Sequence, residues 1–75
     1  MGTKSEVIKA ANLVFKYRLG STAILQCYMN LRYNQASRLL EQLFDLGVVG
    51  PEIKSRPREV LIWSEEDLHN VLKNK

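Results

Sequence analysis

Three polar side chains within residues 34–38 can form hydrogen bonds with the edges of nucleic-acid bases: Asn34, Gln35 and Arg38. Arginine suits O6 and N7 of guanine, and asparagine or glutamine suits N6 and N7 of adenine. All three lie at the N-terminal end of the polar face of a predicted helix, the part of a recognition helix that reads bases. A polar face is also ordinary on any solvated helix, so the face alone leaves both interpretations open.

A second polar group follows in the segment Lys54-Ser55-Arg56-Pro57-Arg58. In an extended chain this alternation predicts that the three cations point to one side. Proline stiffens the segment, and the serine hydroxyl can donate a hydrogen bond to phosphate. The pattern predicts a basic wing that clamps DNA phosphates, with a charged hairpin that keeps a sheet edge soluble as the alternative.

The helices that would position these groups follow from apolar spacing. A first helix is predicted from about residue 4 to about 17, after a Thr-x-x-Glu capping box that begins at Thr3. Ser21 and Thr22 cap a short second helix, and Ser21 is also placed to contact phosphate. Asn34 is predicted to cap the third helix, and Gly47 to end it. The buried face of that helix is predicted to contain Ala36, Leu39, Leu40 and Leu43.

The remaining segments predict a small β-hairpin and a last helix. Val48-Val49 and residues 59–63 read as strands, because β-branched residues favour extended chain. Ser64 caps a C-terminal helical extension over 64–75. The predicted fold is mostly α with a small β-hairpin: a winged helix-turn-helix forming a single domain over residues 1–75. Residues 1–3 read as a tag or a start.

Several isolated residues could suggest other chemistry, and each has a simpler interpretation. Cys27 is the single cysteine and is predicted to be a buried structural thiol, in a chain without a disulfide or a cysteine-based metal site. His69 is the single histidine and has no catalytic setting. The aromatic residues Tyr28, Tyr33 and Trp63 do not cluster in sequence and are predicted to lie in the core or at its edge.

Composition agrees with a small binding domain. The 75 residues carry a formal net charge of +3, a mild excess that is compatible with a polyanionic partner. No apolar run approaches the roughly 20 residues needed to span a bilayer, and no phosphate-binding Gly-x-x-x-x-Gly-Lys loop is present. We therefore expect no catalytic residue, no metal, no cofactor and no membrane contact by this segment.

Three motifs together resemble the γ domain of the FtsK/SpoIIIE family of DNA translocases. They are YNxAxR over 33–38, GVVGP over 47–51 and SRPREVL over 55–61. The resemblance covers roughly residues 5–62. Among the residues it carries over are Asn34 and Arg38 on the helix, and Ser55, Arg56 and Arg58 on the wing.

The resemblance implies a C-terminal winged-helix module that binds short, skewed chromosomal sequences in double-stranded DNA. Such a module orients or loads a hexameric translocase, contacts the motor domain of its parent protein and, in some members, contacts a Xer-type recombinase. A motor ATPase would then lie outside this chain. The expected location is cytoplasmic and nucleoid-associated, in a parent protein that can carry a membrane anchor.

The chain departs from the family pattern in ways that move positive charge. Arg32 replaces a usual glycine in the turn before the helix, where it could reach a phosphate, and Gln35 replaces a usual basic residue. Lys54 stands where many members have glycine, and Cys27 where many have a basic residue. Two alternatives stay open: a protein-interaction winged helix, and a stand-alone transcriptional regulator from a mobile element.

Overall fold

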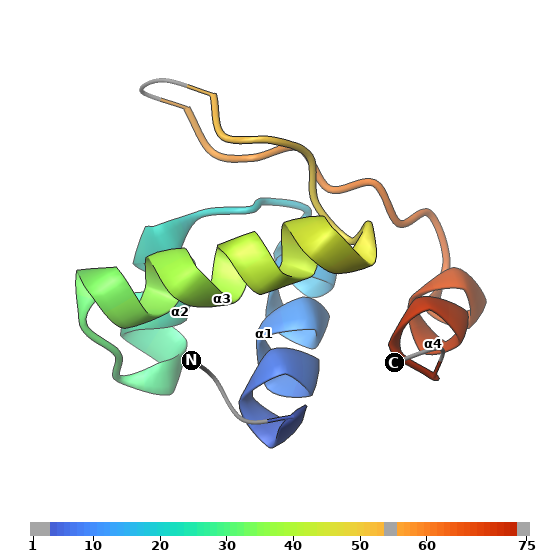
Figure 1. Cartoon of the computed structure of the whole chain (residues 1–75), viewed down its shortest axis with the longest axis horizontal. Coiled ribbons are helices and arrows are strands. Elements are labelled where there is room, and N and C mark those ends of the chain that lie inside the picture. The colour runs from blue at the N-terminus through green and yellow to red at the C-terminus, as the bar shows by residue number, and fades with distance from the viewer. Residues whose placement is uncertain (1–3, 54–55, 74–75) are drawn as a thin grey trace.

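Four helices make up most of the chain that the computed structural model describes, residues 4–53 and 56–73 (Figure 1). They are α1 (Lys4–Tyr17), α2 (Thr22–Met29), α3 (Tyr33–Leu46) and α4 (Glu65–Lys73). The first three contact one another, and α4 packs against α1. Figure 1 shows α1 between α2 and α4. The four predicted helices are therefore confirmed.

None of these helices has the length and apolar composition that crossing a bilayer requires, within the ranges just given.

Local sequence signals set several helix ends as predicted. The Ser21 hydroxyl accepts a hydrogen bond from the Ala23 amide at 3.1 Å, and caps α2. The Ser64 hydroxyl accepts one from the Asp67 amide, also at 3.1 Å, at the start of α4. Gly47 ends α3 with φ of 88°, a left-handed conformation that costs glycine little. The capping box that was predicted to begin at Thr3 starts outside the described residues.

The start of α3 differs from the prediction. The N-cap is Arg32, so Asn34 lies inside the first turn and does not cap the helix. The Gln35 side chain accepts a hydrogen bond from the backbone N–H of Arg32 at 3.0 Å. That contact satisfies an amide at the helix entry, which a capping box does through its third helical residue. The Asn34 side chain is exposed on the helix surface instead.

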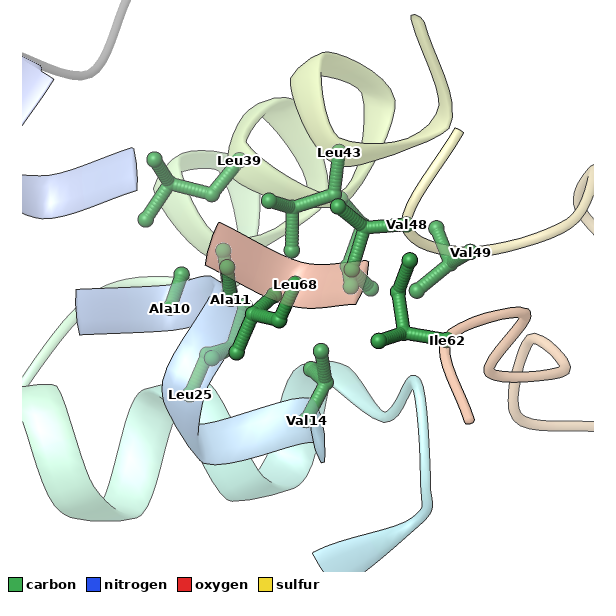
Figure 2. Packing of buried hydrophobic residues seen from close by; sticks show 12 residues of the cluster. Ala10, Ala11, Val14, Leu25, Leu39, Leu43, Val48, Val49, Ile62 and Leu68 are labelled. Carbon is green, nitrogen blue, oxygen red and sulfur yellow. The ribbon is translucent and has the colours of Figure 1, made fainter. Parts of the chain in front are cut away.

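The core lies between the first three helices and closes against the residues that follow α3 (Figure 2). The predicted buried face of α3 is confirmed, with Ala36, Leu39, Leu40 and Leu43 all buried. The small residues Ala10 and Ala11 of α1 are also fully buried, and small side chains allow helices to approach closely. The other buried apolar residues are Val14, Leu25, Val48, Val49, Ile62 and Leu68.

Residues 48–53 and 56–61, here together called the doubled-back segment, run out from α3 and return in antiparallel register. The Gly50 amide donates to the Glu59 carbonyl at 2.8 Å, and the Arg56 amide donates to the Ile53 carbonyl at 3.1 Å. Pairing among the described residues consists of isolated bridges, including one between Val49 and Val60, so the two predicted strands do not form as strands and the predicted wing hairpin is not confirmed. Figure 1 shows the segment projecting beyond the helices.

A close backbone approach joins this segment to the loop between α1 and α2. Gly20 and Arg58 exchange two backbone hydrogen bonds, each of 3.0 Å. A Cβ atom on residue 20 would lie 2.7 Å from the Arg58 carbonyl oxygen and 2.8 Å from its Cβ. Glycine is therefore required at this position by the space available.

Four residues predicted to be buried or at the core edge are exposed, which corrects the sequence analysis. Cys27 is an exposed thiol. Tyr28, Tyr33 and Trp63 are 55%, 61% and 78% exposed. Leucine, valine and alanine side chains already fill the interior of this small domain, which leaves the large rings outside. Tyr28 stacks on Tyr17 across the outside of α1 and α2, with ring centroids 5.2 Å apart.

Candidate nucleic-acid interface

The exposed face of α3 gathers the three residues predicted to read bases. Asn34, Gln35 and Arg38 are all exposed near the N-terminal end of the helix. Asn34 and Arg38 are one helical turn apart, so their side chains are neighbours. The Gln35 carbonyl oxygen is occupied by the amide of Arg32, which leaves its NH₂ group to face outward. Arg32 itself is exposed at the entry to the helix.

A polar hollow of about 320 Å³ lies beside this face. It opens between the start of α2, the first turns of α3 and the doubled-back segment. Four hydroxyl-bearing residues line it, together with the exposed guanidinium group of Arg56. The hydroxyl-bearing residues are Ser21, Thr22, Tyr33 and Ser37. The start of α2 adds backbone N–H groups and the positive end of a helix dipole, both of which favour an anion. The Glu52 carboxylate also lines the hollow, where it forms an ion pair with Arg58.

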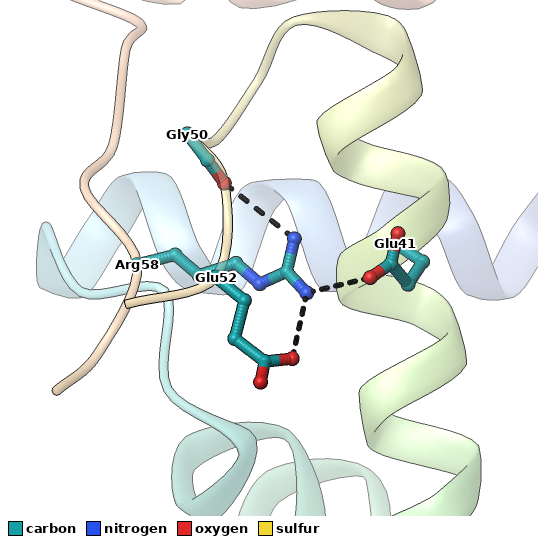
Figure 3. A network of polar contacts seen from close by, with 4 residues as sticks. All are labelled: Glu41, Gly50, Glu52 and Arg58. Carbon is teal, nitrogen blue, oxygen red and sulfur yellow. Dashed lines mark hydrogen bonds and ion pairs between the residues drawn. The ribbon is translucent and has the colours of Figure 1, made fainter. Parts of the chain in front are cut away.

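The structure separates the cations that the alternating pattern placed on one side. Arg56 is exposed, but Arg58 is only 5% exposed and points inward (Figure 3). The predictions for Lys54 and Ser55 lie outside the described residues. The sequence analysis assumed that Arg58 faces outward to clamp phosphate, and this assumption is wrong. The backbone pairing with Gly20 holds residue 58 against the body of the domain.

Arg58 joins the doubled-back segment to α3 instead. Its Nη2 atom is 2.9 Å from Oε1 of Glu41 and 3.6 Å from Oε1 of Glu52 (Figure 3). Its Nη1 atom donates to the Gly50 carbonyl at 3.5 Å, and the guanidinium carbon lies 6.0 Å from the centre of the Phe44 ring. A buried arginine is tolerated because its charge is paired and its N–H groups have acceptors. The contact fixes the segment relative to α3.

Sequence reasoning missed part of the hollow. Tyr33 and Ser37 are one helical turn apart on the flank of α3 that faces the doubled-back segment. The i, i+4 spacing of two hydroxyl-bearing residues was the available signal. Only the packing of the segment against α3 decides that this flank borders a hollow.

The hydrogen bond with Tyr17, and the interaction between the two phenols, raise the pKa of Tyr28. Neither tyrosine lines the hollow. Among the described residues, no three His, Cys, Asp or Glu side chains come close enough to hold a metal ion. The chemistry of this face is therefore that of hydrogen bonding and charge.

These features define a small helical domain with one polar, anion-compatible face. Residues 5–63 match the family described as the Ftsk gamma domain, and the chain belongs to this family. The match ends at Trp63, before α4. The family is a domain of a DNA translocase and not its motor, so the prediction that this chain is not itself an enzyme is confirmed.

Curated relatives agree with the family. The DNA translocase FtsK of Tropheryma whipplei is 38% identical over 66 residues, which cover 88% of this chain and 9% of the relative. That of Chlorobaculum tepidum is 36% identical over 66 residues, or 88% of this chain and 8% of the relative. That of Borreliella burgdorferi is 43% identical over 54 residues, which cover 72% of this chain and 7% of the relative. The chain thus spans less than a tenth of the length of these relatives. No solved structure gives a significant match.

Proposed function

We propose that this chain is a winged-helix module that binds double-stranded DNA by sequence. In this proposal α3 enters the major groove, and Asn34 and Arg38 contact base edges, with Gln35 contributing through its NH₂ group. The proposal rests on the observation that α3 buries one face in the core and exposes these side chains near its N-terminal end. A recognition helix reads bases with that end.

The doubled-back segment acts as the wing and holds the DNA backbone. Arg56 and the hydroxyl groups of Ser21 and Ser37 line the polar hollow, where a phosphate group would meet the Arg56 cation and several donors, while the Glu52 carboxylate of the same lining is paired with Arg58. Arg32, exposed at the entry of α3, contacts a neighbouring phosphate. Arg58 has a different part: it holds the wing at a fixed place beside α3.

Family membership supports a more specific role. The relatives are named DNA translocases, and the chain corresponds to one domain of such a protein. The proposed module reads short skewed chromosomal sequences and so orients or loads the motor domain of its parent. It works on the nucleoid in the cytoplasm, and a Xer-type recombinase is its further proposed partner. One module covers a limited surface, so several copies would share a site longer than a few base pairs.

The test is selection of binding sites from random duplex DNA at two salt concentrations. A short, non-palindromic, G-rich motif is expected, with affinity that falls as salt rises because phosphate contacts release counterions. Lys9→Ala is a matched control, since Lys9 is an exposed cation on α1 that does not line the polar hollow. A palindromic motif would favour the stand-alone regulator. Absence of any enriched sequence at both salt concentrations would contradict DNA reading and favour protein docking.

A further inference from the structure

An exposed apolar surface surrounds Trp63, where the doubled-back segment leads into α4. Trp63 is 78% exposed, and Leu19 and Ile53 are 40% and 43% exposed. With Arg18 and Arg56 these residues line a hollow of about 450 Å³. We call these five residues the Trp63 face.

The indole ring is exposed, but the backbone that carries it is held in place. Arg18 donates hydrogen bonds to the carbonyl oxygens of Ile62 and Trp63, the second at 3.2 Å. The Ile62 side chain is buried, and Ser64 caps α4 directly afterwards. A large ring on a fixed backbone loses little conformational entropy when a partner covers it. Tryptophan is also enriched among the residues that dominate protein interfaces.

The Trp63 face overlaps the proposed DNA-binding face only at the doubled-back segment, through Ile53 and Arg56. Tyr33 and Ser37 of α3 line the polar hollow, whereas the described lining of the Trp63 hollow includes no residue of α3. Ile53 and Arg56 border both hollows, because the doubled-back segment lies between them. Contacts of a duplex with α3 itself would therefore leave Trp63 uncovered, and Arg56 is the side chain that both proposed interactions use.

The charges beside Trp63 are complementary to one another. Arg18 and Arg56 border the hollow. Arg18 donates its hydrogen bonds to carbonyl groups, which carry no charge and so do not neutralise the guanidinium group. The exposed acids Glu65, Glu66 and Asp67 form the first turn of α4 and begin two residues after Trp63. A surface that carries both signs next to an apolar centre matches a second copy of itself across a two-fold axis.

We propose that the Trp63 face binds the same face of a second copy of this chain. The two indole rings meet near the axis, and the acidic first turn of each α4 lies opposite the arginines of the other copy. The acidic turn follows Trp63, near which the match to the family ends. This pairing does not require DNA.

Sedimentation of the intact chain over a concentration series tests the pairing. Trp63 is the only tryptophan, so its fluorescence reports directly on this face. We expect a monomer–dimer equilibrium, emission that moves to shorter wavelength as the dimer forms, and weaker association at high salt. Trp63→Ala is expected to weaken association at least about tenfold, which corresponds to about 1.4 kcal/mol. Leu61→Ala is the matched control, because Leu61 is exposed but does not line the hollow.

A charge exchange makes the test independent of packing at Trp63. Arg56→Glu and Glu66→Arg are each expected to weaken the dimer, because each places like charges opposite one another in both halves of a two-fold interface. An equimolar mixture of the two variants restores opposite charges in both halves and is expected to associate as a heterodimer. Circular dichroism checks that each variant is folded.

Three results would overturn the proposal. The first is a monomer at every concentration up to the order of 1 mM, where even weak association is detected. The second is a dimer that Trp63→Ala leaves unchanged, and the third is a mixture of the charge variants that fails to associate. If the monomer shows the emission change only with duplex DNA or with an acidic peptide, the face belongs to that partner and not to a second copy.

Discussion

Replacing Arg58 with methionine removes the guanidinium group from its buried place but keeps an unbranched apolar stem there. The lost contacts are a charge-assisted hydrogen bond of 2.9 Å to Glu41, a longer ion pair to Glu52 and a weak bond to the Gly50 carbonyl. Hydrogen bonds to charged groups contribute about 1.5–3 kcal/mol, but exposed partners reduce that value. Glu41 is 58% and Glu52 76% exposed, so water replaces the arginine around both carboxylates.

We therefore expect Arg58→Met to lower the free energy of unfolding by about 1–2 kcal/mol. For a domain of this size that is a fall in Tm of about 4–16 °C, measured by circular dichroism during thermal unfolding. Because Glu41 acts through Arg58, adding Glu41→Gln to Arg58→Met is expected to change stability by less than about 0.5 kcal/mol. Glu41→Gln alone leaves a buried cation poorly paired, and is expected to cost about 1 kcal/mol.

DNA binding separates this structural role from a phosphate contact. If Arg58 only holds the wing, Arg58→Met leaves the slope of log affinity against log salt unchanged at temperatures where the variant is folded. Arg56→Ala is the matched comparison, because Arg56 is exposed on the same segment; its loss is expected to flatten the slope by about one unit. An Arg58→Met variant with the normal Tm and a slope reduced by one would refute the inward assignment.

Three further predictions concern other parts of the fold and the site. Gly20→Ala is expected to lower the free energy of unfolding by about 1–3 kcal/mol in thermal unfolding, because the added Cβ meets backbone atoms of Arg58. Gly50→Ala is the control and should cost clearly less, because its Cβ would lie 3.8 Å from the nearest heavy atom. Equal costs for the two variants would contradict the steric argument. Arg38→Ala is expected to cost about 1–3 kcal/mol at the selected DNA site and to relax base preference, so an unchanged preference would remove it from the readers. Tyr17→Phe removes the phenol that raises the pKa of Tyr28, so an absorbance titration should show tyrosinate at Tyr28 forming at lower pH; no movement would mean that the hydrogen bond is absent in solution.

The helices and the core could be predicted from the sequence because local rules determine them. The spacing of Leu39, Leu40 and Leu43 identifies a buried face, and Ser64 and Gly47 mark helix ends through contacts with residues a few positions away. These signals need no knowledge of distant segments. The start of α3 is the exception: Asn34 was the predicted cap, but the N-cap is Arg32, whose amide donates to the Gln35 side chain.

The direction of the cations on the doubled-back segment could not be predicted in this way. Alternation groups residues by side but does not say which side faces the protein. Here the close approach at Gly20 and the carboxylate of Glu41, both distant in sequence, turn Arg58 inward. The exposure of Trp63 also could not be predicted from local sequence. The volume of the core depends on how the whole domain packs, so a local pattern does not show whether the core has room for a large ring.

The contacts that Gly20 and Glu41 make with Arg58 affect which duplex geometries the domain would accept. Both hold the doubled-back segment at Arg58, one against the α1–α2 loop and the other against α3. The spacing between α3 and the doubled-back segment is therefore set by the folded protein before any DNA is present. A duplex that binds must match that spacing with its own groove width, so base pairs that no side chain touches still affect affinity through their stiffness and shape.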